Sequence, residues 1–127
     1  MTEDSYPILT PTQVEQQLRS LSRRIAEAQD ENAAVEMSYS TSKAELEIAM
    51  AVSRLKYADM SKPSGKGFTV DERDDHATVE NMDLIRAVAV EEAKVKASRG
   101  RINQLNTQAD IARSVSTSVR TSMTLEG

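Results

Sequence analysis

Residues 9–55 read LTPTQVEQQLRSLSRRIAEAQDENAAVEMSYSTSKAELEIAMAVSRL and decide the fold. Small and aliphatic residues recur along this stretch at alternating steps of four and three, the heptad pattern of a coiled-coil helix. The positions of this first seam are Val14, Leu18, Leu21, Ile25, Ala28, Asn32, Val35, Tyr39, Ser42, Leu46 and Ala49. A helix of this length spans about 70 Å, so the seam requires a partner along it.

Two features interrupt this first seam. Asn32 has two interpretations: it pins the register by penalising slipped pairings, or the seam loosens there and the side chain meets water. Beyond Ala49 the apolar positions move to Ile48, Val52 and Leu55, which predicts that the contact stripe rotates toward a second surface.

Capping signals and helix breakers give the boundaries of one helical domain, 1–127. Thr10 and Gln13 form a capping box that starts a helix over 10–60 after an arm over 1–9. The breakers in SKPSGKG place a loop at 61–68. Thr69 and Glu72 form a second capping box for a helix over 69–120, with a possible bend near Gly100. A frayed tail follows at 121–127.

A second heptad seam runs along this second helix. Its positions are Ala77, Asn81, Leu84, Val88, Glu91, Val95, Ser98, Ile102, Leu105, Ala109, Ala112, Ser116, Val119 and Met123. Two long helices joined by a short loop predict an all-α fold, an antiparallel coiled-coil hairpin. In this register Arg54 and Lys56 face the acidic residues 71–75, and Arg99 and Arg101 face Asp30 and Glu31.

Apolar residues outside the two seams predict a homo-oligomer, ring-like or a bundle. They are Ile48, Val52 and Leu55 on the first helix and Val79, Met82, Ala89, Ala93 and Ala97 on the second. A two-helix hairpin cannot enclose a core, and the simplest cover for these stripes is another copy of the chain.

The composition excludes several classes of protein. With four glycines and 3% aromatic residues, the 127-residue chain lacks the makeup of a sandwich, a barrel or a conventional enzyme core. With no cysteine it has neither disulfides nor thiolate metal sites. The apolar runs are too short to cross a bilayer, and the acidic N-terminus is unlike a signal peptide. We therefore expect a cytoplasmic protein.

Candidate catalytic groups are scarce, so we expect no enzyme, no cofactor and no metal. His76 lies four residues after Glu72 and could share a metal with it, but two ligands fall short of the three or more that a metal site needs. The simpler interpretation is an acidic helix start beside one solvated histidine. The Gly65-Lys66 pair lacks the earlier glycine and the following Ser or Thr of a phosphate-binding loop.

Basic side chains gather in two segments although the net charge is −4. Residues 54–66 carry a net +3 and residues 93–127 a net +4, whereas 67–92 carry −6. Because phosphate contacts are made by local patches, the loop lysines, expected to be free, are candidates for binding a nucleic-acid backbone. Tyr57 could stack on a base or pack at the helix end.

The segment SRLKYADMSKPSGKGFTVDERDD, residues 53–75, resembles the helix–loop–helix junction of UvsY-type recombination mediators of tailed phages. A basic-aromatic helix end, Arg54 to Tyr57, precedes the Gly-rich loop, and Phe68 to Asp71 opens a long helix; the resemblance covers about residues 43–120. It implies a ring-forming helical protein that binds single-stranded DNA, a single-strand-binding protein and a recombinase. The implied DNA contacts are Arg54, Lys56, Lys62 and Lys66, with Arg113 and Arg120.

We therefore predict an accessory protein of phage DNA recombination, in the host cytoplasm, that binds single-stranded DNA and helps to load a recombinase. The alternative is a coiled-coil module that binds only proteins, such as a virion assembly component or an inhibitor of a host protein.

Overall fold

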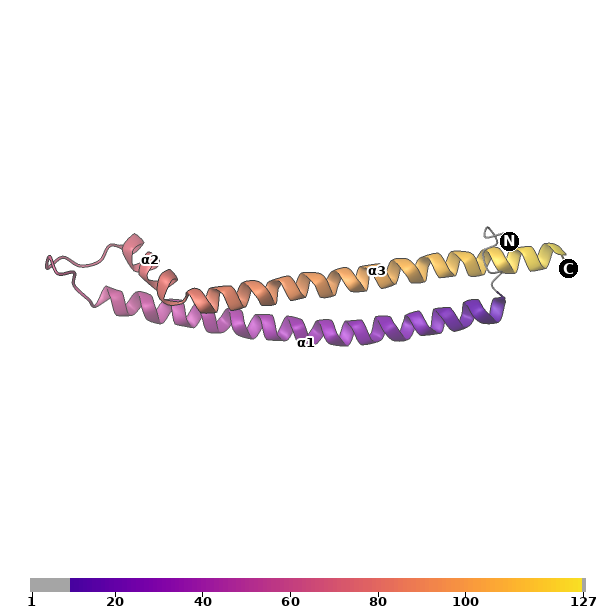
Figure 1. The fold of residues 1–127 in the computed structure, drawn as a ribbon, viewed down its shortest axis with the longest axis horizontal. Helices are drawn as coiled ribbons and strands as arrows, with labels where there is room; N and C mark the ends of the chain where they lie inside the picture. Colours follow the sequence, from indigo (N-terminus) through magenta and orange to yellow (C-terminus); the bar gives the residue numbers. More distant parts are fainter. Residues whose placement is uncertain (1–9, 127) are drawn as a thin grey trace, which may run out of the picture. The chain divides into compact units, whose positions relative to one another are not determined.

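The computed structural model describes residues 10–126, and within this range the chain is helical, as predicted. Its helices there are α1 (Pro11–Ala58), α2 (Val70–Glu80) and α3 (Met82–Glu126), of 48, 11 and 45 residues (Figure 1). Extended pairing in the described range is limited to one isolated bridge between Ser61 and Gly67. The predicted arm over 1–9 lies outside the described residues.

Both predicted capping boxes are confirmed and fix where α1 and α2 begin. The Thr10 amide donates to Gln13 Oε1 at 2.9 Å, and the Gln13 amide donates to Thr10 Oγ1 at 3.2 Å. Thr69 and Glu72 exchange the equivalent hydrogen bonds at 3.3 and 3.2 Å. Each box satisfies two backbone N–H groups that lack a partner inside the helix.

The second predicted helix differs from the structure in being divided at Asn81. Asn81 has φ −107° and ψ 20°, outside helical geometry, and it ends α2. Its side-chain amide donates to the Ala77 carbonyl and to Ser53 Oγ, each at 2.9 Å. The break is therefore held by a contact with α1.

The C-terminal end also differs, because α3 continues to Glu126 where a frayed tail is predicted from residue 121. The threonines here bond the preceding helical turn: Thr117, Thr121 and Thr124 donate to the carbonyls of Arg113, Thr117 and Arg120 at 2.9–3.1 Å. Because these hydroxyl groups donate to carbonyls of the helix itself, they do not draw the backbone into hydrogen bonds that would end the helix.

Gly100 marks no break, since α3 runs through it, and a Cβ added there meets no atom within 4 Å. Replacing Gly100 with alanine should therefore raise the free energy of unfolding by about 0.5–1 kcal/mol, because alanine loses less backbone entropy in a helix. Thermal unfolding followed by circular dichroism measures this. A lower melting temperature for Gly100→Ala would reveal a close neighbour at this position.

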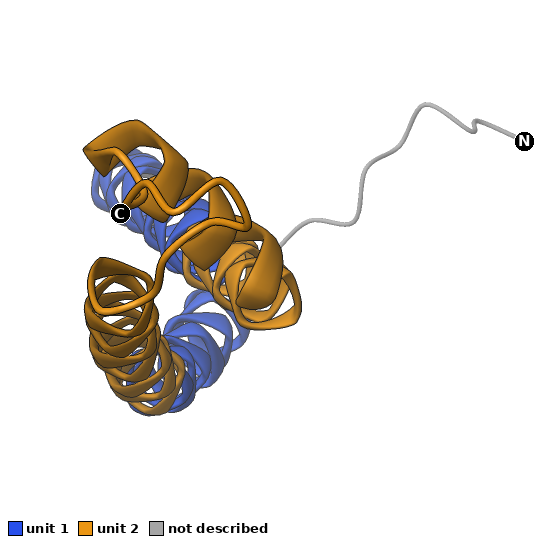
Figure 2. Cartoon of the chain, turned by 90° about the vertical axis from the view of Figure 1, so that its left-hand side faces the viewer, with its two compact units in different colours: residues 1–31, 98–127 blue, residues 32–97 orange. Residues whose placement is uncertain are grey.

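The contacts within the chain gather in two compact units, where the sequence predicts one domain (Figure 2). Unit 1 comprises residues 1–31 and 98–127, and unit 2 comprises residues 32–97. Since a residue on a long helix contacts only neighbours at its own level, long helices separate naturally into such units. Each is described by itself below.

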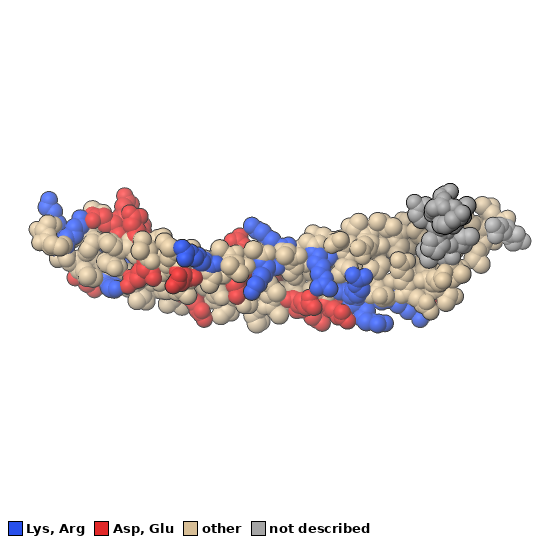
Figure 3. Space-filling model, viewed as in Figure 1, with Lys and Arg blue, Asp and Glu red and all other residues tan. Residues whose placement is uncertain are grey.

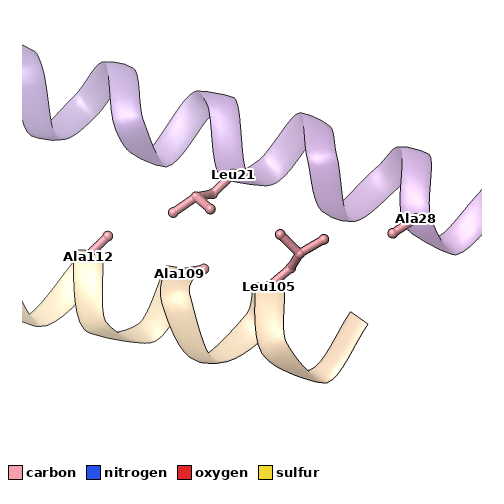
Figure 4. Packing of buried hydrophobic residues seen from close by; sticks show 5 residues of the cluster. All are labelled: Leu21, Ala28, Leu105, Ala109 and Ala112. Atoms are coloured by element: carbon pink, nitrogen blue, oxygen red, sulfur yellow. The ribbon is translucent and has the colours of Figure 1, made fainter. Parts of the chain in front are cut away.

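Unit 1 has an apolar core built from both predicted seams. Leu21, Ala28, Leu105, Ala109 and Ala112 are buried, and Leu18, Ile25 and Ile102 pack against them. Figure 4 shows Leu21 pointing toward Ala109 and Ala112, while Leu105 points toward α1 near Ala28. Large side chains thus meet small ones, which lets two helices approach closely. Arg101 pairs with Glu31 at 3.2 Å, as predicted.

Unit 2 is packed less fully along its seam. Val95, Ala77 and Ser53 are buried, but Asn32, Val35, Leu46 and Val88 are only half-buried. Leu84 is 40% exposed and the half-buried Ile85 lies inward in its place, whereas the predicted seam continues beyond them at Val88 and Val95. Among residues 10–126, Asn32 Oδ1 is a buried side-chain oxygen without a hydrogen-bond donor.

Within unit 2 the contact face of α1 does not move onto the three residues predicted to turn toward a second surface, and these residues face outward. Ile48, Val52 and Leu55 are 65%, 60% and 67% exposed, whereas Ser53 and Tyr57 continue the inward face. On this inward face Ser53 accepts a hydrogen bond from Asn81. No helix in the described range is long and apolar enough to cross a membrane.

Candidate nucleic-acid interface at the loop between α1 and α2

The loop between α1 and α2 is a tight, hydrogen-bonded turn. The Gly65 amide donates to the Lys62 carbonyl and the Lys62 amide donates to the Lys66 carbonyl, both at 2.8 Å. Pro63 is the second residue of the turn 62–65, a position that suits the φ angle fixed by the proline ring. Gly65 has a φ of 85°, which residues with a side chain rarely adopt. The turn holds the backbones of Lys62 and Lys66 side by side.

An aromatic cluster supports this loop on the two helices. The Tyr57 and His76 rings stack with centroids 4.6 Å apart and planes at 15°. Phe68 meets both edge-on, at 5.5 Å from Tyr57 and 5.1 Å from His76. Of the two roles predicted for Tyr57, the structure supports packing at the helix end. On the ring face that His76 covers, a base could stack only by displacing His76.

The predicted basic residues at this end are mostly paired with carboxylates. Arg54 Nε lies 2.7 Å from Asp74 Oδ1, and Lys56 Nζ lies 2.5 Å from Glu80 Oε1. Lys62 Nζ lies 2.6 Å from Glu72 Oε1. The prediction that this ammonium group is free is therefore wrong. Arg54 faces the acidic residues 71–75 as predicted. Lys56 instead pairs with Glu80, which lies beyond these residues on α2.

Lys66 is the exception at this end. Its side chain is exposed, and no carboxylate pairs with it among residues 10–126. Figure 3 shows basic and acidic side chains next to one another near the loop, so no purely basic patch is seen at this end on the face in view. A phosphate group approaching this end would meet one unpaired ammonium group and several ion pairs.

The ion pairs shift the pKa values of their members. The hydrogen bond from Lys62, opposed by partial burial and aided by Thr69, lowers the pKa of Glu72. Hydrogen bonds from Lys56 and then Ser53 lower the pKa of Glu80, and the bond to Glu80 raises the pKa of Lys56. These side chains stay charged over a wider pH range than isolated groups.

The Lys62–Glu72 pair predicts a pH-dependent contribution to stability. Because folding lowers the pKa of Glu72, this contribution is present above the ordinary carboxyl pKa and is lost as pH falls through the folded pKa. The fall in melting temperature from about pH 6 to about pH 3 should be smaller for Lys62→Met than for the wild type. Lys66→Met, which removes an unpaired lysine, should keep the wild-type fall. Equal falls in all three would contradict this.

The other two predicted contacts lie in unit 1. Arg113 donates to Asp110 Oδ1, three residues earlier on α3, at 2.8 Å. Arg120 lies beside a shallow groove with Thr117, Thr121, Thr124 and Leu125 and has no ion pair within the described chain. Arg19, Arg23 and Arg24 are likewise exposed and have no carboxylate partner among residues 10–126.

Sequence reasoning missed two features of this end: the stacking of His76 and the bond between Asn81 and Ser53. Glu72 bonds Lys62 and Thr69 while His76 stacks on Tyr57, so neither is directed at a shared metal. The described residues contain no group of three or more metal-binding side chains.

Compared with known protein families, with characterised proteins and with solved structures, the chain matches none.

Proposed function

We propose that this protein is a non-enzymatic helical scaffold that assembles with itself and presents its helices to partner proteins. The observation that carries this proposal is the exposed apolar face of α1 in unit 2, where Ile48, Val52 and Leu55 are each at least 60% exposed. Val79 on α2 and Val90 on α3 are also exposed, at 67% and 55%. Exposed apolar side chains that share one helix face support contact with another protein.

The proposal includes an antiparallel coiled-coil hairpin formed by the two long helical segments. In unit 1, Glu31 pairs with Arg101, and the higher-numbered Ala109 and Ala112 lie near the lower-numbered Leu21. In unit 2, Arg54 pairs with Asp74 across the loop. This order supports helices that run in opposite directions. Such a hairpin leaves one outer face on each helix for further contacts.

Light scattering at micromolar concentration tests the self-assembly. The chain has a mass of 14.0 kDa, and we expect a measured mass of at least twice this value. A monomer at this concentration would overturn self-assembly.

We propose a second function, the binding of single-stranded DNA together with a single-strand-binding protein and a recombinase, on the grounds of the resemblance described above. It is favoured by the cations without carboxylate partners in the described chain, Lys66, Arg19, Arg23, Arg24 and Arg120. The ion pairs at Arg54, Lys56 and Lys62 weigh against it, because a phosphate would have to displace a carboxylate from each.

A salt series of single-stranded DNA binding decides between these functions. A mediator should bind at low salt, and its affinity should fall steeply as salt rises, with a slope of about −0.7 per phosphate contact on a log–log plot. Lys66→Glu should weaken binding and reduce that slope, while Lys94→Glu, the same change at an exposed lysine on α3, should have less effect. No binding at low salt would leave only the protein scaffold.

A further inference from the structure

The outer face of α1 in unit 2 carries a heptad pattern of its own, separate from the seam that faces the rest of the unit. Its positions, again at alternating steps of three and four, are Ala34, Met37, Thr41, Ala44, Ile48, Ala51, Leu55 and Ala58. All eight are exposed, and Met37, Ile48 and Leu55 are 73%, 65% and 67% exposed. None carries a charge.

This heptad pattern indicates that the element which packs on the outer face of α1 is itself a helix. A stripe of period 3.5 winds slowly around a helix, and only another helix crossing at a shallow angle follows it for several turns. The stripe covers 25 residues, about three and a half heptads, so a second helix can follow it over several turns. Every second position from Ala44 onward is alanine, so the covering helix can approach closely there.

We propose that the cover is the same face of α1 in a second copy of the chain, running antiparallel about a two-fold axis between Ala49 and Met50. This rests on the proposed self-assembly and adds its face and its direction. In this register Ile48 lies opposite Ala51 of the second copy, and Leu55 lies opposite Ala44 of the second copy. Thr41 lies opposite Ala58 of the second copy, so the two helices overlap over residues 41–58, and Ala34 and Met37 lie beyond this overlap. Each larger side chain meets an alanine, which gives evenly filled layers.

Charge complementarity at the edge of the stripe supports the same register. Glu47 and Arg54 flank it on one side, and the two-fold places Glu47 of each copy beside Arg54 of the other. Arg54 uses Nε for Asp74 and is exposed, so its remaining N–H groups are available. Parallel pairing would instead stack Ile48 on Ile48 and Ala51 on Ala51, and the helices could not fill both layers at one separation.

Cysteine cross-linking tests the direction cleanly, because the chain has no cysteine of its own. Ala44→Cys chains are mixed with size-tagged Leu55→Cys chains, re-equilibrated and oxidised. We expect disulfides between the two kinds of chain and few in Ala44→Cys alone, whose cysteines would lie about 17 Å apart along the helix axis. A disulfide requires Cα atoms within about 7 Å. Efficient cross-linking of Ala44→Cys to itself would show parallel pairing and overturn the proposal.

Charge insertion tests the face. Ala51→Glu buries two unpaired carboxylates in the proposed interface and should raise the dissociation constant on the order of 100-fold or more. Ala26→Glu makes the same change at an exposed alanine of α1 outside the stripe and should leave the measured mass unchanged. Circular dichroism verifies that both variants remain helical.

The possible failures are distinguishable. A monomeric wild-type chain overturns both this pairing and the self-assembly on which it rests. An oligomer that tolerates Ala51→Glu, or that lacks the mixed cross-link, keeps the self-assembly and overturns this face. In that case the outer stripe of α3, which runs through Val90, Ala93, Ala97 and Ile111, is the next surface to examine.

Discussion

Replacing Leu105 with alanine is expected to lower the free energy of unfolding by about 2–4 kcal/mol. Leu105 is 3% exposed and belongs to the cluster of Leu21, Ala28, Ala109 and Ala112. Three of these neighbours are already alanines, so the helices cannot fill the space left by three missing carbon atoms without moving. Urea denaturation followed by circular dichroism measures the loss.

The chain provides a matched control for this substitution on the same helix. Leu125 is 82% exposed, so Leu125→Ala removes the same atoms without opening a cavity and should change stability by less than about 0.5 kcal/mol. Similar losses for the two variants would mean that the core of unit 1 does not hold the fold together as described.

Replacing Asn81 with alanine is expected to cost about 1–3 kcal/mol. The amide of Asn81 is the donor to Ser53 Oγ, and Ser53 is only 6% exposed, so the substitution leaves a buried hydroxyl group without this partner. A double-mutant cycle with Ser53→Ala isolates the contact. We expect the two substitutions to be non-additive by about 0.5 kcal/mol or more. Additive losses would show that the Asn81–Ser53 bond does not hold the break between α2 and α3.

Much of the fold could be predicted because its determinants are local or periodic. Thr10 and Gln13, or Thr69 and Glu72, fix a helix start within four residues, and the heptad steps identify buried positions such as Leu21 and Leu105. The division at Asn81 could not be predicted in this way. The heptad steps pass through Asn81 unbroken, and the bond that holds the break comes from Ser53, 28 residues earlier.

The candidate site was harder to predict for a related reason. Counting residues outward from the loop in an antiparallel register places Arg54 beside the acidic start of α2, and the Arg54–Asp74 pair follows that expectation. The pairing of Lys62 with Glu72 and the stacking of His76 on Tyr57 depend on the path of the loop. That path is set by the turn at Gly65 and by packing on Phe68. Neither feature produces a repeating pattern in the sequence from which it could be predicted.

The three ion pairs at this end make α2 the segment most sensitive to ionic strength. Arg54, Lys56 and Lys62 attach it to α1 and the loop, and its own buried surface is limited to Ala77. Exposed ion pairs weaken as salt is added, whereas the apolar core of unit 1 does not. Rising salt should therefore increase local opening of α2 before global unfolding, with hydrogen exchange of its backbone amides accelerating first.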